Sequence, residues 1–174
     1  MKKYSLILIF MIVAIQGNAQ SYMPWTLPFS VQDSLKKIAE TEDQRIKAMV
    51  YSNTGSYYFR SNGDSAMLYL SKAEKIAKEN KFIDLLPKIY FEMGSVENNL
   101  TGNYPMGLYH GFEQLKYSTL MQDRPKISGE NAYSRNIYIA YLNIALCYAY
   151  LGNTEKAKEY MQKFKIDYNW SVIK

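Results

Sequence analysis

Few side chains of this sequence could carry out catalysis. The 174 residues include one histidine, His110, and one cysteine, Cys147. A zinc site or a hydrolase triad combines histidine or cysteine with further ligands or partners, and a lone histidine does not hold a metal. We therefore expect His110 to be a structural or surface residue. Cys147 stands in the apolar stretch 144–148, where we expect a small, buried core side chain.

Carboxylates are the remaining candidates for acid–base chemistry. Glu40, Glu42 and Asp43 are close in sequence, but they fall at a break between helical patterns, where acids commonly occupy a first helical turn. A carboxylate-only glycosidase needs two acids facing each other in a cleft. No glycine-rich phosphate loop, CxxC or HExxH motif occurs. The sequence thus predicts a protein that is not an enzyme and that uses no metal and no cofactor.

The first 19 residues have the pattern of a secretory signal peptide. Lys2 and Lys3 precede an apolar run over residues 4–15, and small or polar residues follow up to Ala19. A membrane-spanning helix needs roughly 20 apolar residues, so the length of this run disfavours a retained anchor. We predict cleavage after Ala19, a periplasmic or secreted location, and no stable membrane insertion after signal cleavage.

The charge of the mature chain is mildly positive. Once Lys2 and Lys3 are taken from the 21 basic residues, 19 remain against 16 acidic ones. They are mixed with acids, as in residues 72–79, and do not form a basic patch. Together with the export signal, this excludes nucleic acid as an expected partner.

The elements that position the side chains are predicted to be helices. Pro24 and Pro28 indicate an extended lead-in over residues 20–30. From Val31 onward apolar residues recur at helical spacing, and no stretch alternates long enough to form a strand. We expect Asp64, Asn103 and Asn153 to cap the helices that follow them. Breaks rich in Gly, Asn, Asp or Pro fall at residues 41–43, 61–63, 79–81, 101–103, 123–129 and 152–153.

One pattern of residues occurs three times between these breaks. It consists of a small residue, an aromatic residue three places later, a Gly-Asp or Gly-Asn turn, another small residue, and a core residue seven places after that. The first copy is Gly55, Tyr58, Gly63-Asp64, Ala66 and Ala73; the third is Ala145, Tyr148, Gly152-Asn153, Ala157 and Phe164. The second copy, Gly94, Gly102-Asn103, Gly107 and Gln114, is degenerate, with Glu97 at the aromatic place.

This pattern resembles the tetratricopeptide repeat, a helix-turn-helix unit that stacks into a solenoid. The resemblance implies an all-α fold, a right-handed α-α superhelix of about three helix pairs plus an N-terminal helix over residues 31–40. The repeat domain would span residues 31–167, followed by a C-terminal tail over 168–174. The steps between Ala66, Gly107 and Ala157 exceed the usual 34 residues, in part because of an insertion at 123–130. Aromatic packing places of the family fall on Tyr51, Tyr58, Tyr90, Tyr141 and Tyr148.

A narrower resemblance concerns residues 33–40, 51–58 and Gly63-Asp64-Ser65-Ala66. They are similar to exported bacterial tetratricopeptide proteins and to the extracytoplasmic repeat portions of sensor histidine kinases and helix-turn-helix regulators. The resemblance implies an exported scaffold whose concave surface binds a protein or peptide partner. The alternative is the sensing portion of a split or truncated signal-transduction system.

The family's concave groove is lined by the first helix of each pair. When the groove positions of the family are matched to this sequence, the resemblance implies the following partner-binding residues: Ser52, Ser56, Phe59, Phe91, Ser95, Asn98, Leu142, Leu146 and Ala149. The last three are all apolar, so they could instead be buried by the final helix and Trp170. The final helix, expected to end near Asp167, carries a further apolar face that the tail or a second copy of the chain could cover. A homo-oligomer formed through this helix is therefore an additional expectation.

Overall fold

The computed structural model describes residues 40–59, 61–122 and 132–173. The predicted signal peptide, the lead-in, the insertion at 123–130 and nearly all of the predicted helix at 31–40 lie outside the described residues. Within them the chain consists of helices and turns, without a β-strand. The prediction of an all-α fold is confirmed.

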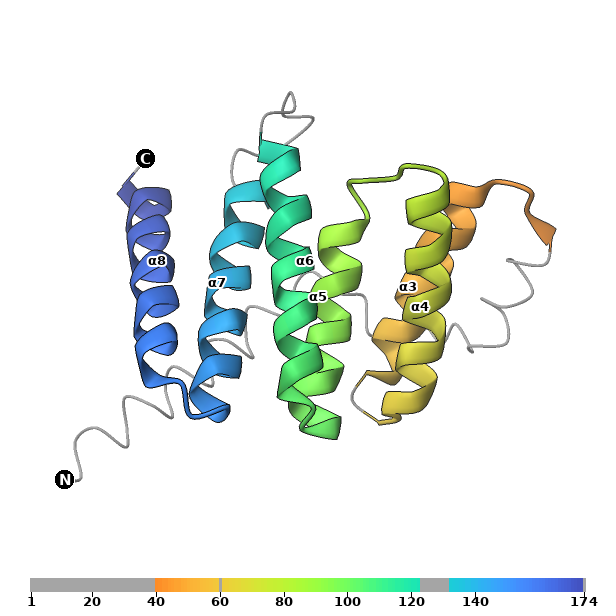
Figure 1. The fold of residues 1–174 in the computed structure, drawn as a ribbon. Helices are drawn as coiled ribbons and strands as arrows, with labels where there is room; N and C mark the ends of the chain where they lie inside the picture. Colours follow the sequence, from red (N-terminus) through yellow and green to blue (C-terminus); the bar gives the residue numbers. More distant parts are fainter. Residues whose placement is uncertain (1–39, 60, 123–131, 174) are drawn as a thin grey trace. The chain divides into compact units, whose positions relative to one another are not determined.

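Six α-helices and one π-helical turn follow one another in the described residues (Figure 1). They are α3 (Gln44–Tyr58), α4 (Gly63–Glu79), α5 (Leu86–Val96), η1 (Glu97–Thr101), α6 (Tyr104–Gln122), α7 (Ala132–Tyr150) and α8 (Thr154–Ile173). Consecutive helices pack against each other, so that α3–α4, α5–α6 and α7–α8 form three pairs. The turns within the pairs all lie at the lower end of the helices in Figure 1. We call α3, α5 and α7 the first helices and α4, α6 and α8 the second helices.

Side-chain caps and left-handed turns separate the helices. Asn103 and Asn153 cap α6 and α8 as expected, since their Oδ1 atoms accept from the backbone N–H groups of Met106 and Lys156. The cap of α4 is Asn62, whose Oδ1 accepts from Ser65 N at 2.9 Å. The expectation that Asp64 caps this helix is wrong: it lies in the first turn, where its charge suits the helix dipole.

Small residues of the repeat pattern lie where paired helices approach each other closely. A Cβ built on Gly55 of α3 would lie 2.6 Å from Leu70 Cγ and 3.1 Å from the Ala66 carbonyl oxygen of α4. A Cβ built on Gly94 of α5 would lie 3.6 Å from the carbonyl oxygen of Gly107 in α6. These contacts let the helices of a pair pack at short distance.

The core of the first two pairs extends from these contacts. Tyr90 is fully buried among aliphatic side chains of α4 and α5. Its ring stacks on that of Tyr117, with centroids 5.7 Å apart. Gln114, the polar residue at a core position of the degenerate copy, is buried as well, and its Nε2 donates to the carbonyl oxygen of Asn136. A hydrogen bond between two helix pairs thus replaces an apolar contact at this position.

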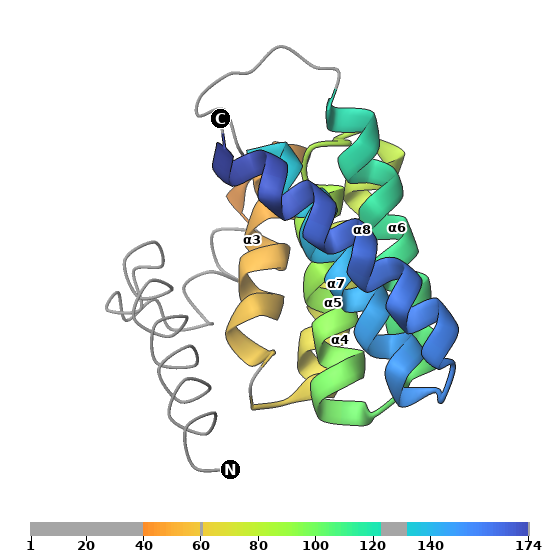
Figure 2. The same ribbon diagram turned by 90° about the vertical axis from the view of Figure 1, so that its left-hand side faces the viewer.

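The last helix is longer than expected. The predicted end near Asp167 is wrong, because α8 continues to Ile173 and no glycine or proline interrupts residues 154–173. Figure 2 shows α8 in front of α7 and crossing it obliquely. Tyr160 and Phe164 contact aromatic residues of α7, whereas Lys156 and Lys163 form ion pairs with Glu159. The part of α8 with described side chains therefore has an aromatic inner side and a charged outer side.

Two turns depend on glycine, which gives a first prediction. Gly102 and Gly152 have φ of +68° and +77° with open space around the Cβ position. Replacing either by alanine is expected to cost about 1 kcal/mol, because a side chain disfavours left-handed backbone. Urea unfolding followed by circular dichroism measures this. Gly63→Ala is the control, since Gly63 has no such φ and a Cβ there would make ordinary contacts. Equal losses in all three variants would contradict the argument.

Candidate partner-binding surface

Each first helix has one side on its second helix and an opposite side exposed. In α3, Ala48 and Gly55 face α4 and are buried. Three apolar residues lie on the other side of this helix, at intervals of three or eight residues: Ile46, Met49 and Tyr57. All three are exposed, Tyr57 by 61%.

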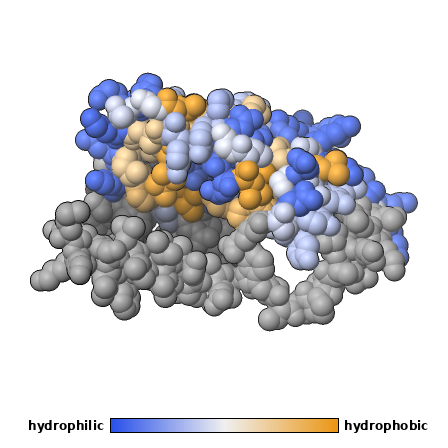
Figure 3. Space-filling model, turned by 90° about the horizontal axis from the view of Figure 1, so that it is seen from below, coloured by the Kyte–Doolittle hydropathy of each residue, from blue (hydrophilic) through white to orange (hydrophobic). Residues whose placement is uncertain are grey.

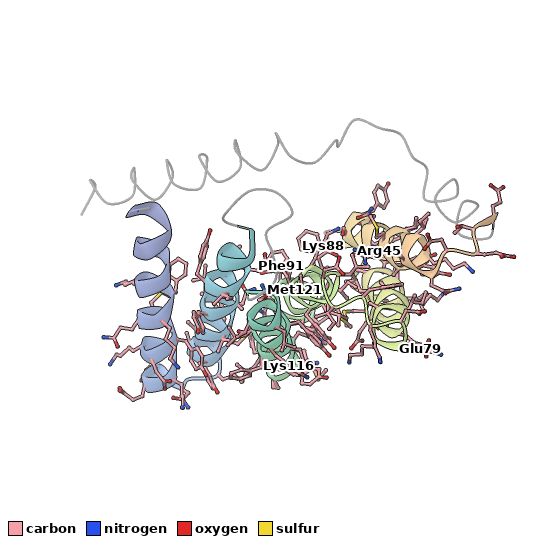
Figure 4. All side chains as sticks on the ribbon, turned by 90° about the horizontal axis from the view of Figure 1, so that it is seen from above. Arg45, Glu79, Lys88, Phe91, Lys116 and Met121 are labelled. Atoms are coloured by element: carbon pink, nitrogen blue, oxygen red, sulfur yellow. The ribbon has the colours of Figure 1, made fainter. Side chains whose placement is uncertain are left out.

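The same side of α5 carries Lys88, Phe91 and Ser95. Phe91 is 38% exposed, whereas phenylalanine side chains are most often buried in the core of a protein. Figure 4 shows Lys88 and Phe91 on one side of the helices, and Glu79 of α4 and Lys116 of α6 on the other. Exposed residues of α5 therefore point away from the second helices.

In α7 the exposed side is apolar. Leu142 is half-buried, Ala149 is exposed, and Leu146 is 43% exposed. Leu146 and Ala149 are therefore not buried by α8. The side chain of Trp170, which the alternative also names, lies outside the described residues. We define the first-helix face as the following exposed or half-buried side chains of α3, α5 and α7: Ile46, Met49, Asn53, Tyr57, Lys88, Phe91, Ser95, Leu142, Leu146 and Ala149.

Four of the nine residues implied by the resemblance, Ser52, Ser56, Phe59 and Asn98, make contacts with other helices. Ser52 is only 5% exposed, and its hydroxyl lies 3.4 Å from Glu92 Oε2. Ser56 is half-buried and donates to Glu92 Oε1 at 2.5 Å. Phe59 packs against the core formed by α4 and α5. Asn98 Oδ1 accepts from Cys147 Sγ at 3.2 Å and would lie 1.9 Å from a Cβ built on Gly107.

A buried carboxylate links α3 to α5 beneath the first-helix face. Besides the two serines, Glu92 Oε1 lies 3.6 Å from Lys88 Nζ, which also donates to Asn53 Oδ1 at 2.8 Å. Burial raises the pKa of Glu92 above its ordinary value, while Lys88 and the serine hydroxyls act in the opposite direction. Lys88 and Asn53 thus form a polar site at the surface, directly above a carboxylate that burial disfavours in its charged form.

Glu92 gives a second prediction, for the pH dependence of stability. Its pKa is raised in the folded chain, so the folded state binds the proton more readily than the unfolded state. The stabilisation of the folded chain by protonated Glu92 is complete below the pKa of Glu92 in the unfolded chain, about 4.3. It is lost as the pH rises through the pKa of Glu92 in the folded chain. Lowering the pH from about 7 to about 4.5 should therefore stabilise the native chain relative to Glu92→Gln.

Glutamine keeps the size and the acceptor for Ser56, so Glu92→Gln should fold. Urea unfolding of both chains at several pH values measures the difference between their unfolding free energies. Parallel pH profiles would show that Glu92 is charged to the same extent in both states.

Sequence reasoning missed the contribution of α3 residues Ile46, Met49, Asn53 and Tyr57. The family positions were counted from Gly55 and fell on Ser52 and Ser56, which lie on the flank of α3 toward α5. A signal was present, because an apolar residue that recurs at helical spacing outside the core stripe marks a second apolar side.

The described residues contain no group of three or more His, Cys, Asp or Glu side chains placed to hold a metal ion. None of their helices combines the length and the apolar character needed to cross a membrane. Cys147 is buried, as expected for a core residue, and burial raises the pKa of its thiol. His110 is buried too, which makes it a structural and not a surface residue.

The stacked helix pairs place the described residues in a known class of fold. They form a tetratricopeptide-like all-α solenoid, in which each pair packs on its neighbours along the chain. The crystal structure of the TPR domain of Arabidopsis FLU is similar to this chain, with a TM-score of 0.63 and 20% sequence identity. The similarity covers 73% of this chain and 98% of that domain. No family model and no curated protein sequence matches the chain.

Proposed function

We propose that this chain is a non-enzymatic binding module that holds a protein or peptide partner on the first-helix face. The observation that supports this most directly is the exposure of apolar side chains on three successive first helices. Tyr57, Phe91 and Leu146 belong to different helix pairs, and each is exposed. Figure 4 shows Phe91 on the side away from Glu79 and Lys116 of the second helices.

The chemistry of the face fits an apolar partner segment with some polar groups. Aromatic side chains such as Tyr57 and Phe91 offer a large contact area at low entropic cost. Lys88 and Asn53 add hydrogen-bonding groups at the edge of α5 and α3, which can fix the orientation of a bound segment. Apolar residues also reach the surface elsewhere: Figure 3 shows hydrophobic residues between hydrophilic ones at the lower end of the helices.

Site-specific photocrosslinking tests which side binds. A benzophenone amino acid would replace Phe91 or Leu146 on the first-helix face. Matched controls place it at Leu68 of α4 and Leu120 of α6, which are exposed apolar residues of second helices. We expect one covalent adduct, of the same mass, from Phe91 and Leu146 and none from the controls. Adducts from Leu68 and Leu120 alone would show that the partner binds on the second helices and not on the first-helix face.

A third prediction concerns affinity for the crosslinked partner. Phe91→Asp should weaken binding by about tenfold or more, since a charge replaces an apolar anchor, and tenfold corresponds to about 1.4 kcal/mol. Leu120→Asp is the control, with an expected change below about twofold. Isothermal titration calorimetry measures both. An unchanged affinity in Phe91→Asp, with the native circular dichroism spectrum retained, would contradict binding at this face.

We also propose that the chain is exported, on the basis of the pattern in its first 19 residues. Release of the protein by osmotic shock or into the medium, with Gln20 as its first residue, would support this. Full-length protein that stays in carbonate-washed membranes would contradict it.

The alternative function is that of the sensing portion of a signal-transduction system, which would use the same face. A gene for a histidine kinase or a helix-turn-helix regulator beside this one would favour it. A homo-oligomer through α8 remains a proposal of its own, for which the charged outer side of residues 155–163 is unfavourable. Light scattering of the mature chain decides it, because a monomeric mass excludes a stable dimer.

A further inference from the structure

The imidazole of His110 lies in the contact between α5 and α6 without a hydrogen-bond partner. The residue is 3% exposed, and neither Nδ1 nor Nε2 has a partner. The ring centroid lies 5.9 Å from that of Tyr90 in α5, and the Cβ atom lies 3.4 Å from the Cβ position of Gly94. A neutral imidazole leaves one donor and one acceptor unpaired here. Protonation would leave two donors unpaired and add a buried charge.

Charged groups surround this contact from three elements, but each is already engaged. Glu74 of α4 accepts from Lys78 Nζ at 2.7 Å and from the Tyr90 hydroxyl at 2.5 Å. Glu97 of η1 accepts from the Thr101 hydroxyl at 2.7 Å, and Glu113 of α6 pairs with Lys116. From α7, the neighbouring contact is apolar, with Ile144 against Gly111. No carboxylate therefore holds the imidazole in its charged form through a hydrogen bond.

The balance of these effects favours the neutral ring. Burial lowers the pKa of His110, and Lys78 acts in the same direction. Glu97, Glu74 and Glu113 raise it through space without cancelling the effect of burial. The neutral form is thus the one that the packed α5–α6 pair accommodates.

We propose that His110 makes the α5–α6 contact an acid-sensitive joint, which opens when the imidazole takes up a proton. The unpartnered ring between two close-packed helices carries this inference. Each helix pair of the solenoid contacts only its neighbours, so opening α5–α6 also loosens the packing of α5 on α3 and of α6 on α7. The first-helix face would then lose its central helix. The joint does not depend on a partner, so this proposal and the proposed function fail separately.

The pH range follows from the sign of the pKa shift. A histidine in an unfolded chain titrates near 6.5, and His110 titrates lower in the folded chain. Above about pH 6.5 the equilibrium constant for opening does not depend on this group. Below about pH 6.5, His110 is protonated in the open state but still neutral in the folded state. The equilibrium constant for opening then rises by up to about tenfold per pH unit, until the pH reaches the pKa of His110 in the folded chain.

A direct test uses the fact that His110 is the only histidine of the chain. In a protein without a polyhistidine tag, the Hε1 proton signal of the single imidazole reports its titration by nuclear magnetic resonance. We expect a lower pKa in the folded chain than in the same chain unfolded in concentrated urea. A folded pKa equal to or above the urea value would overturn the proposal without any variant.

The second test compares the native chain with His110→Gln, which keeps a polar side chain but does not titrate. Between about pH 7 and about pH 5 the unfolding constant of the native chain should rise about tenfold more than that of the variant. The titration of Glu92 affects both chains equally and cancels. Hydrogen exchange should show increased opening at low pH in α5 and α6 of the native chain. Identical pH profiles of the two chains, or opening confined to α3 or α8, would overturn the proposal.

Discussion

Replacing Ala66 by phenylalanine is expected to destabilise the chain by about 3 kcal/mol, at the upper end of the range for overpacked cores. Ala66 is completely buried in α4, among Leu70, Ala73 and Ala77. Its carbonyl oxygen lies 3.1 Å from the Cβ position of Gly55, so the two helices have no free space for a ring. Helices α3 and α4 would have to separate, or the new side chain would have to leave its preferred rotamers.

The matched control is Leu68→Phe, two residues along the same helix. Leu68 is 53% exposed, so a larger side chain there should change the unfolding free energy by less than about 0.5 kcal/mol. Ala157→Phe in α8 should cost less than Ala66→Phe, since Ala157 is half-buried. Urea unfolding followed by circular dichroism measures all three. Similar losses at Ala66 and Leu68 would show that α3 and α4 do not pack through the small residues.

Tyr90→Ala is expected to cost about 4 kcal/mol, because it removes a fully buried aromatic side chain from the core. The ring of Tyr90 contacts Tyr117 and His110, and its hydroxyl donates to Glu74. Burial and the bond to Glu74 raise the pKa of Tyr90, so the hydroxyl remains protonated and can donate throughout the neutral range.

Tyr90→Phe separates the two contributions. It keeps the ring and removes the hydrogen bond, which should cost about 1–2 kcal/mol for a bond to a charged group. Tyr57→Ala is the control for the loss of a tyrosine ring at the surface, with an expected cost below about 1 kcal/mol. Calorimetric unfolding of the three variants gives the comparison. A loss in Tyr90→Ala no larger than that in Tyr57→Ala would exclude Tyr90 from the core.

The sequence predicted the helix pairs well because their signals are local. Glycine and asparagine at residues 102–103 and 152–153 give turns and caps through their own backbone and side-chain preferences. The small residues at 55 and 66 predicted a close helix contact, since only small side chains permit one. Gln114 was identified as a polar residue at a core position, and the structure shows it buried with a partner in α7.

The candidate site was less predictable, because it depends on how one pair packs on the next. Ser52 lies in the contact with α5 and reaches Glu92, forty residues away, so its burial depends on the register between two pairs. The π-helical turn η1 also has no local sequence signal that we recognise, yet it changes the direction of side chains after Val96. Positions copied from a regular repeat do not include such a shift.

The charged outer side of α8 has a consequence for filament formation. A solenoid that exposed an apolar side at its last helix could add further copies head to tail, because the contact would reproduce itself with every copy. Lys156, Glu159 and Lys163 form a chain of ion pairs there, and Lys158 pairs with Glu155. A second copy that docked on these residues would have to remove several charges from water. These ion pairs therefore make the outer side of residues 155–163 unfavourable for docking of a second copy.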